Sequence, residues 1–410
     1  MLRFSLAVLL TGALACAHSP RSAPVNLDGV WHAQLESPGG PLPFGLEVRG
    51  RRAWVRNGEE RAEATGVRRE GKAILFDFAL YDAQIRAEAN EDGSRMQGEW
   101  SYPDWGARRQ LRFSAARGSR RRFEAAAPQG TATGIWRVQF VDDDGEEPAR
   151  AQFTQFGDGT VTGTFLTPTG DYRYLEGALD GNTLRLSCFD GAHAFLFTAK
   201  LSGPDALDGQ FWSANHYRAT WTAERVARVE DAPLPDPYGL ASLTSSDRKL
   251  SFAFEDIEGQ RVDMADPRFR GKVVLVDIFG TWCPNCNDQA PYLAKWHQRY
   301  RERGLEMVGI AYEVSGDAER DREMLRRWRD HHALEFPLLL GGVKDKRRAG
   351  QTLPDLSAVV AYPTTIFVGR DGTVRAVHTG FAGPGTGSAH TSMIREIEGR
   401  IEQLLAETLD

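Results

Sequence analysis

Two cysteines separated by two residues are the side chains of this 410-residue chain best suited to chemistry. Cys283 and Cys286 flank Pro284 and Asn285, and this spacing keeps two sulfur atoms within bonding reach. The thiolate form of cysteine is the nucleophile in thiol–disulfide exchange. In that reaction we expect Cys283 to be the exposed attacking thiol and Cys286 to resolve the mixed disulfide.

Two other kinds of site use cysteines in this way. A structural zinc site needs about four ligands, but the sequence has no second CxxC pair, and His331 and His332 are adjacent rather than at ligand spacing. A peroxiredoxin has a threonine three residues before its reactive cysteine, where this sequence has Gly280. We therefore favour thiol exchange and predict neither a metal nor a cofactor.

A buried strand and a helix are predicted on the two sides of this pair. Residues 273–279 form an apolar run, which is typical of a strand covered on both faces. Pro284 suits the first turn of a helix, and apolar residues then recur at helical spacing up to Tyr300. A helix N-terminus has unpaired N–H groups and the positive end of the helix dipole, both of which stabilise a thiolate. The dithiol is thus predicted where a central strand becomes a helix.

Asp277 interrupts the apolar strand six residues before Cys283. Because Val276 and Ile278 flank it, we expect the carboxyl group to be buried and its pKa to be raised, as a proton acceptor requires. The alternative is a solvated aspartate at the end of the strand.

Residues from about 250 to 410 resemble a thioredoxin-fold domain, specifically the membrane-tethered disulfide reductases of the TlpA/ResA type. The resemblance rests on ordered landmarks: the motif Trp282-Cys283-Pro284-Asn285-Cys286, Pro291 in the following helix, the triplet Tyr362-Pro363-Thr364, and Gly380. It implies that Pro363 is a cis-proline facing the dithiol and that the neighbouring backbone pairs with substrate. The residues it implies at the substrate are Trp282, Pro284, Asn285, Tyr362, Pro363 and Thr364.

The same resemblance bears on Asp277. In thioredoxins a buried aspartate at this offset helps to move the proton of the second cysteine, whereas many TlpA/ResA-type proteins have a different residue there. The catalytic residues implied are Cys283, Cys286 and Asp277. For the rest of the domain we predict strands at 305–312 and 336–340 and helices at 318–332 and 394–405.

The N-terminal segment 1–17 has the pattern of an export signal. A basic residue, Arg3, precedes an apolar stretch from Phe4 to Leu14 that is too short to span a membrane. The sequence Ala13-Leu14-Ala15-Cys16 resembles a bacterial lipobox, which implies a lipid on Cys16; the alternative is a plain signal peptide cut near Ala17. We expect an exported, periplasm-facing protein that is attached to a membrane by its N-terminal lipid.

Residues 27–116 and 130–225 are predicted to be two tandem antiparallel β-modules, each a small barrel or sandwich. Short alternating runs separated by turn dipeptides fill both segments, and Gly29-Val30-Trp31 is echoed by Gly134-Ile135-Trp136. This opening resembles the first strand of lipocalin- and avidin-like barrels. We interpret the arginine-rich run 117–122 as a solvated connection, Cys188 as a buried small hydrophobe and the proline-rich segment 226–249 as a semi-rigid linker.

The fold class predicted is therefore multidomain, with two antiparallel β-modules followed by an α/β thioredoxin-fold domain. A net charge of −6 argues against a nucleic-acid partner. We predict an exported thiol–disulfide oxidoreductase that exchanges, and by resemblance reduces, disulfides in client proteins and receives electrons from a membrane or periplasmic donor. The alternative is a ligand- or partner-binding envelope lipoprotein in which the thioredoxin-like domain serves for docking.

Overall fold

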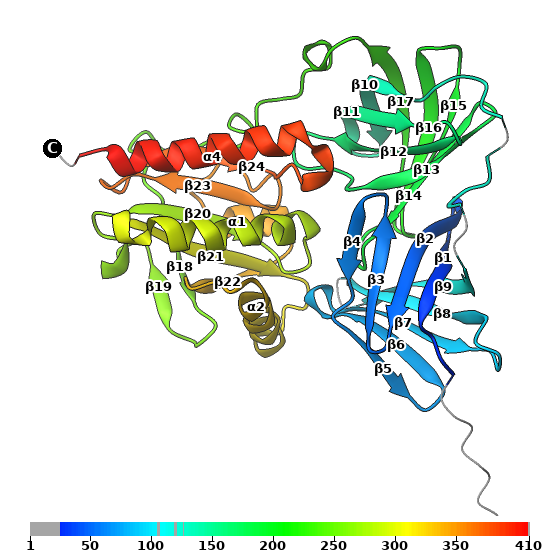
Figure 1. Ribbon diagram of the computed structural model, residues 1–410. Coiled ribbons are helices and arrows are strands. Elements are labelled where there is room, and N and C mark those ends of the chain that lie inside the picture. Colours follow the sequence, from blue (N-terminus) through cyan, green and yellow to red (C-terminus); the bar gives the residue numbers. More distant parts are fainter. Residues whose placement is uncertain (1–24, 105–106, 119–120, 126, 409–410) are drawn as a thin grey trace, which may run out of the picture.

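The computed structural model describes residues 25–104, 107–118, 121–125 and 127–408. The predicted export segment 1–17, with Cys16, lies outside these residues. Figure 1 shows the two β-modules on one side of the molecule and the C-terminal α/β domain on the other. In the described part of the chain, no helix is both long enough and apolar enough to span a membrane.

The first β-module is a strongly curved, nine-stranded antiparallel sheet in the order β4-β3-β2-β1-β9-β8-β7-β6-β5. Alternation builds its core: Trp31, Ala33 and Leu35 on one face of β1 are fully buried. Its strands are β1 (Gly29–Ser37), β2 (Gly40–Arg49), β3 (Arg52–Asn57), β4 (Glu60–Glu63), β5 (Gly66–Glu70), β6 (Ala73–Phe78), β7 (Ala83–Ala89), β8 (Arg95–Asp104) and β9 (Ala107–Arg117).

The second β-module is a closed eight-stranded antiparallel barrel, in which the last strand pairs with the first. Aromatic rings fill its interior, for example Phe165 and Phe197, whose ring centroids are 4.7 Å apart. Its free cysteine, Cys188, is fully buried in this core, as predicted. The strands are β10 (Gly134–Asp142), β11 (Gly145–Gln155), β12 (Thr160–Leu166), β13 (Leu175–Asp180), β14 (Thr183–Phe189), β15 (Ala194–Leu201), β16 (Ala206–Ser213) and β17 (Tyr217–Val226).

The repeated Gly-x-Trp sequence opens both modules in the same way. Trp31 donates its indole N–H to the carbonyl of Leu27 at 2.9 Å, and Trp136 donates to that of Ala132 at 3.0 Å. An arginine on the last strand covers each ring: the guanidinium of Arg117 lies 4.6 Å from the Trp31 ring centroid, and that of Arg225 lies 4.1 Å from that of Trp136. In both modules, an arginine of the last strand thus packs on a tryptophan of the first strand and joins the two strands.

The interpretation of residues 117–122 as a solvated connection is wrong at its C-terminal end. Arg117 packs on Trp31 and is itself exposed to solvent, whereas only 7% of Arg122 is exposed. Arg122 lies between the modules, where it donates to Asn57 of the first at 3.2 Å and pairs with Glu176 of the second at 3.2 Å. The sequence gives no sign of these partners, because Asn57 and Glu176 lie far from Arg122 along the chain.

The C-terminal domain is a five-stranded mixed sheet in the order β22-β21-β20-β23-β24, with β20 at its centre. All seven residues of β20 are buried, as expected for a strand covered on both faces. The sheet contains β20 (Val273–Phe279), β21 (Leu305–Glu313), β22 (Leu338–Val343), β23 (Thr364–Val368) and β24 (Val374–Thr379), and a small hairpin contains β18 (Ala253–Glu255) and β19 (Arg261–Asp263). The helices are α1 (Pro284–Tyr300), α2 (Ala318–His332), α3 (Lys346–Thr352) and α4 (Ser388–Ala406).

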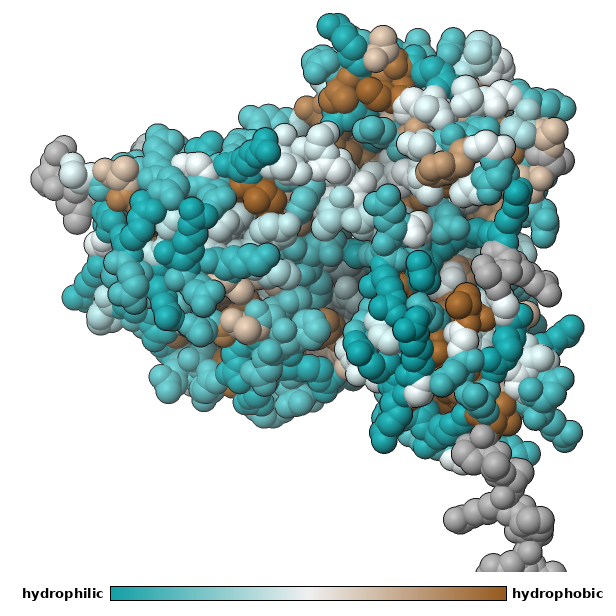
Figure 2. All heavy atoms as spheres, viewed as in Figure 1, coloured by the Kyte–Doolittle hydropathy of each residue, from teal (hydrophilic) through white to brown (hydrophobic). Residues whose placement is uncertain are grey.

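The connector 226–249 packs along this domain. Leu243 and Lys249 form isolated β-bridges with Leu356 and Thr373, and Ala241 is buried in the core of the domain. The view in Figure 2 shows a mainly hydrophilic surface with small, separate hydrophobic patches, the largest of them over the second β-module.

Candidate active site

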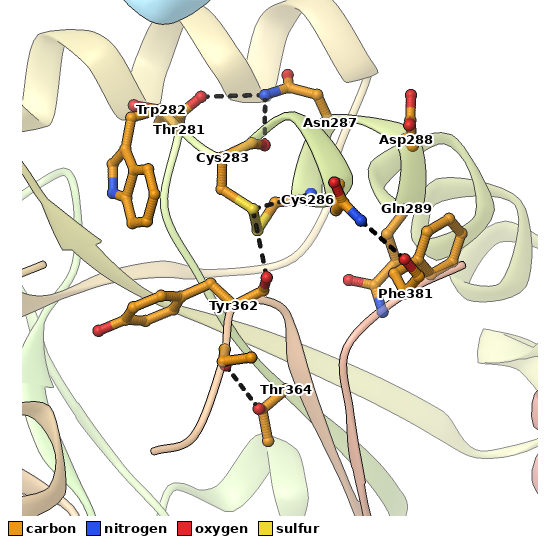
Figure 3. The surroundings of a disulfide bond; sticks show 12 residues. Thr281, Trp282, Cys283, Cys286, Asn287, Asp288, Gln289, Tyr362, Thr364 and Phe381 are labelled. Atoms are coloured by element: carbon orange, nitrogen blue, oxygen red, sulfur yellow. Dashed lines mark hydrogen bonds between the residues drawn. A yellow bond between two sulfur atoms is a disulfide. The ribbon is translucent and has the colours of Figure 1, made fainter. Parts of the chain in front are cut away.

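The dithiol lies at the junction of β20 and α1, with its sulfurs joined in a disulfide and its Cα atoms 5.2 Å apart (Figure 3). Cys283 is the N-cap of α1, and Cys286 lies in the first helical turn. The backbone N–H of Cys286 donates to Cys283 Sγ at 3.2 Å. First-turn N–H groups have no partner inside the helix, so this contact and the helix dipole favour a thiolate on Cys283 when the disulfide is opened.

The expectation that Cys283 is exposed is wrong for this disulfide form, because only 5% of its surface is accessible, and for Cys286 the figure is 1%. The carbonyl oxygen of Tyr362 lies 3.5 Å from Cys283 Sγ. Residues of both β-modules also approach the motif, as described below. The order of the two cysteines was predictable from the sequence, whereas the elements that cover them were not.

The backbone carbonyl of Tyr362 faces the dithiol (Figure 3). The Tyr362–Pro363 peptide bond is cis, as the resemblance implied. The ring of Tyr362 packs edge-on against Trp282, with the centroids 5.5 Å apart. Thr364 donates its hydroxyl to the carbonyl of Ala361 at 2.8 Å, so this side chain fixes its own loop. The carbonyl beside the cis-proline therefore remains directed at the sulfurs.

Trp282 is anchored beside the dithiol by its indole N–H, which donates to the carbonyl of Tyr312 at 2.8 Å. A Cβ added to Gly280 would lie 2.2 Å from the indole nitrogen of Trp282. The position three residues before Cys283 therefore has no room for the threonine of a peroxiredoxin.

Asp277 is buried in the middle of β20, with 3% of its surface exposed. Burial raises the pKa of its carboxyl group to about 7, against which a hydrogen bond from Thr365 acts. Thr365 Oγ1 lies 3.4 Å from Asp277 Oδ1 and accepts a hydrogen bond from Gln289 Nε2 at 2.9 Å. The expectation of a buried carboxyl group is thus correct, but sequence reasoning missed Thr365, which follows the proline triplet, and Gln289, which lies three residues beyond Cys286.

A second buried carboxylate, Glu313, lies at the end of β21 and was also missed. It accepts hydrogen bonds from the backbone N–H of Thr281 at 2.8 Å and from its hydroxyl at 2.7 Å. Burial raises the pKa of Glu313 to about 7. Glu313 thus fixes the loop that leads into the motif. Nowhere in the described residues do three or more His, Cys, Asp or Glu side chains lie where they would hold a metal ion.

Both β-modules contact residues of the motif. Tyr102 of the first module donates its hydroxyl to the carbonyl of Trp282 at 3.4 Å. Asn285 donates to the carbonyl of Phe381 at 2.8 Å, and a Cβ added to Gly170 of the second module would lie 2.6 Å from its amide nitrogen. The dithiol therefore lies where the three units meet.

Arg173 of the second module connects all three units. Its guanidinium pairs with Asp288 of α1 at 2.8 Å, with Asp190 of its own module at 3.0 Å and with Glu60 of the first module at 2.5 Å. The arginine side chain is only 10% exposed. Burial raises the pKa of Asp288, two residues after Cys286, to about 6, although the positive charge of Arg173 acts to lower it.

Comparison with known proteins places the similarity in the C-terminal domain. A sequence model of the AhpC/TSA family matches residues 246–377. The thiol-disulfide oxidoreductase ResA of Halalkalibacterium halodurans is 28% identical over 136 residues, which are 33% of this chain and 69% of that protein. ResA of Bacillus subtilis (strain 168) is 28% identical over 142 residues, 35% of this chain and 71% of that protein.

For other proteins of the same name the chain spans less than two thirds of the relative, for example 63% of ResA of Bacillus anthracis. Among solved structures, a putative thiol:disulfide interchange protein DsbE from Chlorobium tepidum has a TM-score of 0.32 at 21% identity, covering 40% of this chain and all of that one.

The C-terminal unit is thus a thioredoxin-fold domain. More narrowly, with its WCPNC motif and cis-proline loop, it is of the TlpA/ResA type and belongs to the class of thiol–disulfide oxidoreductases.

Proposed function

We propose that this protein is exported and reduces disulfide bonds in client proteins through Cys283 and Cys286. The observation that carries the proposal is the position of Cys283 as N-cap of α1, where Cys286 N–H donates to its sulfur and the Tyr362 carbonyl faces it. The helix start and the N–H of Cys286 favour the thiolate of Cys283. The Tyr362 carbonyl offers a backbone acceptor to an extended client segment.

The reaction needs two exchanges. The Cys283 thiolate attacks one client sulfur, a bond forms between these two sulfurs, and the second client sulfur leaves as a thiolate. The Cys286 thiol then loses its proton to Asp277, and its sulfur attacks Cys283, which releases the first client sulfur. The client gains two electrons and the protein is left as the Cys283–Cys286 disulfide, which a dithiol donor must reduce.

Substitution of each cysteine tests the assignment. Cys283→Ser is expected to abolish turnover of a protein disulfide, and Cys286→Ser is expected to accumulate a mixed disulfide that mass spectrometry detects. Cys188→Ser is the matched control. This buried thiol lies in the barrel core, so its substitution should leave turnover unchanged. Turnover by Cys283→Ser at the rate of the parent protein would contradict the proposal.

The reducing direction requires its own measurement. Thioredoxin, a reductant, has a potential of about −270 mV, and the oxidant DsbA about −120 mV. We expect equilibration with glutathione to place this dithiol nearer to the first value. A potential near the second would leave the exchange reaction in place and reverse its direction.

Export and attachment also belong to the proposal. The lipobox-like sequence at Cys16 supports a lipid anchor on a periplasm-facing protein, with a membrane or periplasmic electron donor. Mass spectrometry of the mature protein tests the anchor: a diacylglyceryl mass on Cys16 is expected, and an unmodified N-terminus would contradict it.

The β-modules are proposed to form walls of the client site. Tyr102 and the segment around Gly170 lie against Trp282 and Asn285, so a client that reaches Cys283 must pass them. Because aromatic rings fill the second module, any ligand of that module would have to bind outside the barrel.

A further inference from the structure

We infer that Thr365 and Gln289 are positioning residues that hold Asp277 and favour its ionised form, so that it is ready to accept the proton of Cys286. This inference rests on the proposed function for its role in catalysis. The hydrogen-bonded chain on which it stands comes from the structure alone.

Three elements bring these side chains together. Asp277 of β20 lies directly opposite Thr365 of the antiparallel strand β23, and such cross-strand partners project from the same face of a sheet. Gln289 reaches Thr365 from α1. Because residues three apart are neighbours on a helix surface, Gln289 lies on the side of α1 that carries Cys286. The chain therefore runs from the helix of the dithiol to the buried carboxyl group.

The direction of the hydrogen bonds matters. A threonine hydroxyl has a single proton to donate. Since Gln289 Nε2 donates to Thr365 Oγ1 at 2.9 Å, the hydroxyl proton is left to point at Asp277 Oδ1, 3.4 Å away. A carboxylate accepts a strong hydrogen bond from this hydroxyl, whereas a protonated carboxyl group is stabilised less by the same bond. Linked bonds of this kind also strengthen one another.

The buried amide of Gln289 lowers the stability of the fold. Gln289 is fully buried, and its Oε1 has no hydrogen-bond partner in the described part of the chain. An unpaired buried acceptor is destabilising, and an apolar side chain of similar size would avoid that cost. The donation to Thr365 is the one polar contact of this amide that the structure records, which agrees with a role in the site rather than in packing.

Few other titratable groups face the hydrogen-bonded residues Gln289, Thr365 and Asp277 among the described residues. On β21 the residue opposite Asp277 is Gly309, and the two cysteines lie at the start of α1, Cys283 as its N-cap and Cys286 in its first turn. On β24 the partner of Thr365 is His378, whose pKa burial lowers to about 4, so it is neutral above pH 5. Glu313, at the end of β21, bonds to Thr281 and titrates near pH 7 as well, so an experiment must separate it from Asp277.

Carbon-13 NMR of the aspartate carboxyl groups in the full-length disulfide form separates them, with Asp277→Asn identifying the signal. In Thr365→Val we expect the Asp277 midpoint to rise by about one pH unit, a tenfold change in its ionisation constant, because a hydrogen bond to the carboxylate is lost. Gln289→Leu should raise it by less, and Thr365→Ser, which keeps the hydroxyl, should restore the parent value.

Thr379→Val is the matched control. Thr379 lies on β24, is 1% exposed, and its hydroxyl has no partner in the described residues, so the same substitution removes no hydrogen bond. An Asp277 midpoint unchanged in Thr365→Val, or raised equally in Thr379→Val, would overturn the inference. The single-turnover rate of resolution in Thr365→Val should show the same shift in its pH profile.

The two proposals fail separately. The NMR titration needs no client and no electron donor, so it tests the chain of hydrogen bonds even if the protein proves unable to exchange disulfides. Conversely, loss of the hydrogen-bond effect would leave the roles of Cys283 and Cys286 intact.

Discussion

At the scale of single residues, the environment of each carboxyl group decides its chemistry. Asp277 and Glu313 have the same functional group and similar raised pKa values, near 7. Glu313 accepts two hydrogen bonds from Thr281 and fixes a loop, whereas Asp277 has one long contact, to Thr365. The less completely bonded group is the one suited to taking up and releasing a proton.

Burial of Asp277 carries a stability cost that depends on pH. Its folded pKa of about 7 lies above the ordinary value of 3.8, so the folded state binds the proton more tightly than the unfolded state. Stability from this group is therefore complete below about pH 4 and is lost as the pH rises towards 7. Asp277→Asn should raise the free energy of unfolding at pH 8 by roughly 4 kcal/mol and change it little at pH 4.

Urea denaturation of the disulfide form at both pH values measures this effect. The same variant should slow resolution by Cys286 more than the first attack by Cys283. Equal stability of parent and variant at pH 8 would mean that Asp277 ionises without penalty, contrary to its burial.

Sequence was sufficient for part of this site. The apolar neighbours of Asp277 predict its burial, and the CxxC spacing predicts a sulfur pair at a helix start. Thr365, Gln289 and Glu313 were not predicted, because each acts through a partner far away in sequence; Gln289 and Thr365, for example, are 76 residues apart.

At the scale of elements, Asn287 joins the active-site helix to its surroundings. Its amide donates to the carbonyls of Thr281 and Cys283 at 3.0 and 3.1 Å (Figure 3). Its oxygen accepts from Trp328 and His332 of α2, each at 2.9 Å. One side chain thus fixes both the motif loop and the packing of α2 against α1.

Asn287→Ala is expected to destabilise the protein by about 2–4 kcal/mol, because it leaves buried partners unpaired. Urea denaturation measures the change. Trp328→Phe removes one of those partners, so the double variant should lose less stability than the sum of the two single variants. Additive losses would show that the contact between Asn287 and Trp328 contributes little.

Elements were predictable where apolar residues recur with a regular period. The helix predicted at 318–332 has the bounds Ala318–His332 in the structure. The last helix, predicted at 394–405, begins earlier, at Ser388, because its first turns contain small and polar residues without an apolar stripe. The strand predicted at 336–340 is Leu338–Val343, since Pro337 precedes it and two glycines extend it.

At the scale of the whole molecule, the three units are held together by charge as well as by packing. Arg173 lies 115 residues from Asp288 in sequence and shares its charge with carboxylates of both modules. Such an arrangement was beyond the reach of the sequence, because no local pattern indicates which arginine will be buried between domains. The tandem β-modules themselves were predictable from their repeated opening.

Arg173→Met should lower the stability of the assembled protein by about 3–5 kcal/mol, because it leaves buried carboxylates without their shared cation. Small-angle scattering is expected to show a larger radius of gyration as the units separate. Arg320→Met is the control: Arg320 pairs with Asp82 between α2 and the first module, but its side chain is 52% exposed, so a change of about 0–1 kcal/mol is expected. Similar effects of both variants would contradict a special role for Arg173.

The buried thiol of Cys188 has a practical consequence. Of the three cysteines that the structure describes, two belong to the reducible pair and the third is sealed in the barrel, where burial raises its thiol pKa. In a folded, reduced sample we therefore expect fast alkylation at Cys283, whose thiolate the start of α1 favours, and alkylation of Cys188 only when the barrel opens. The rate of Cys188 alkylation would therefore report how often the second β-module opens, although this module takes no part in the sulfur chemistry.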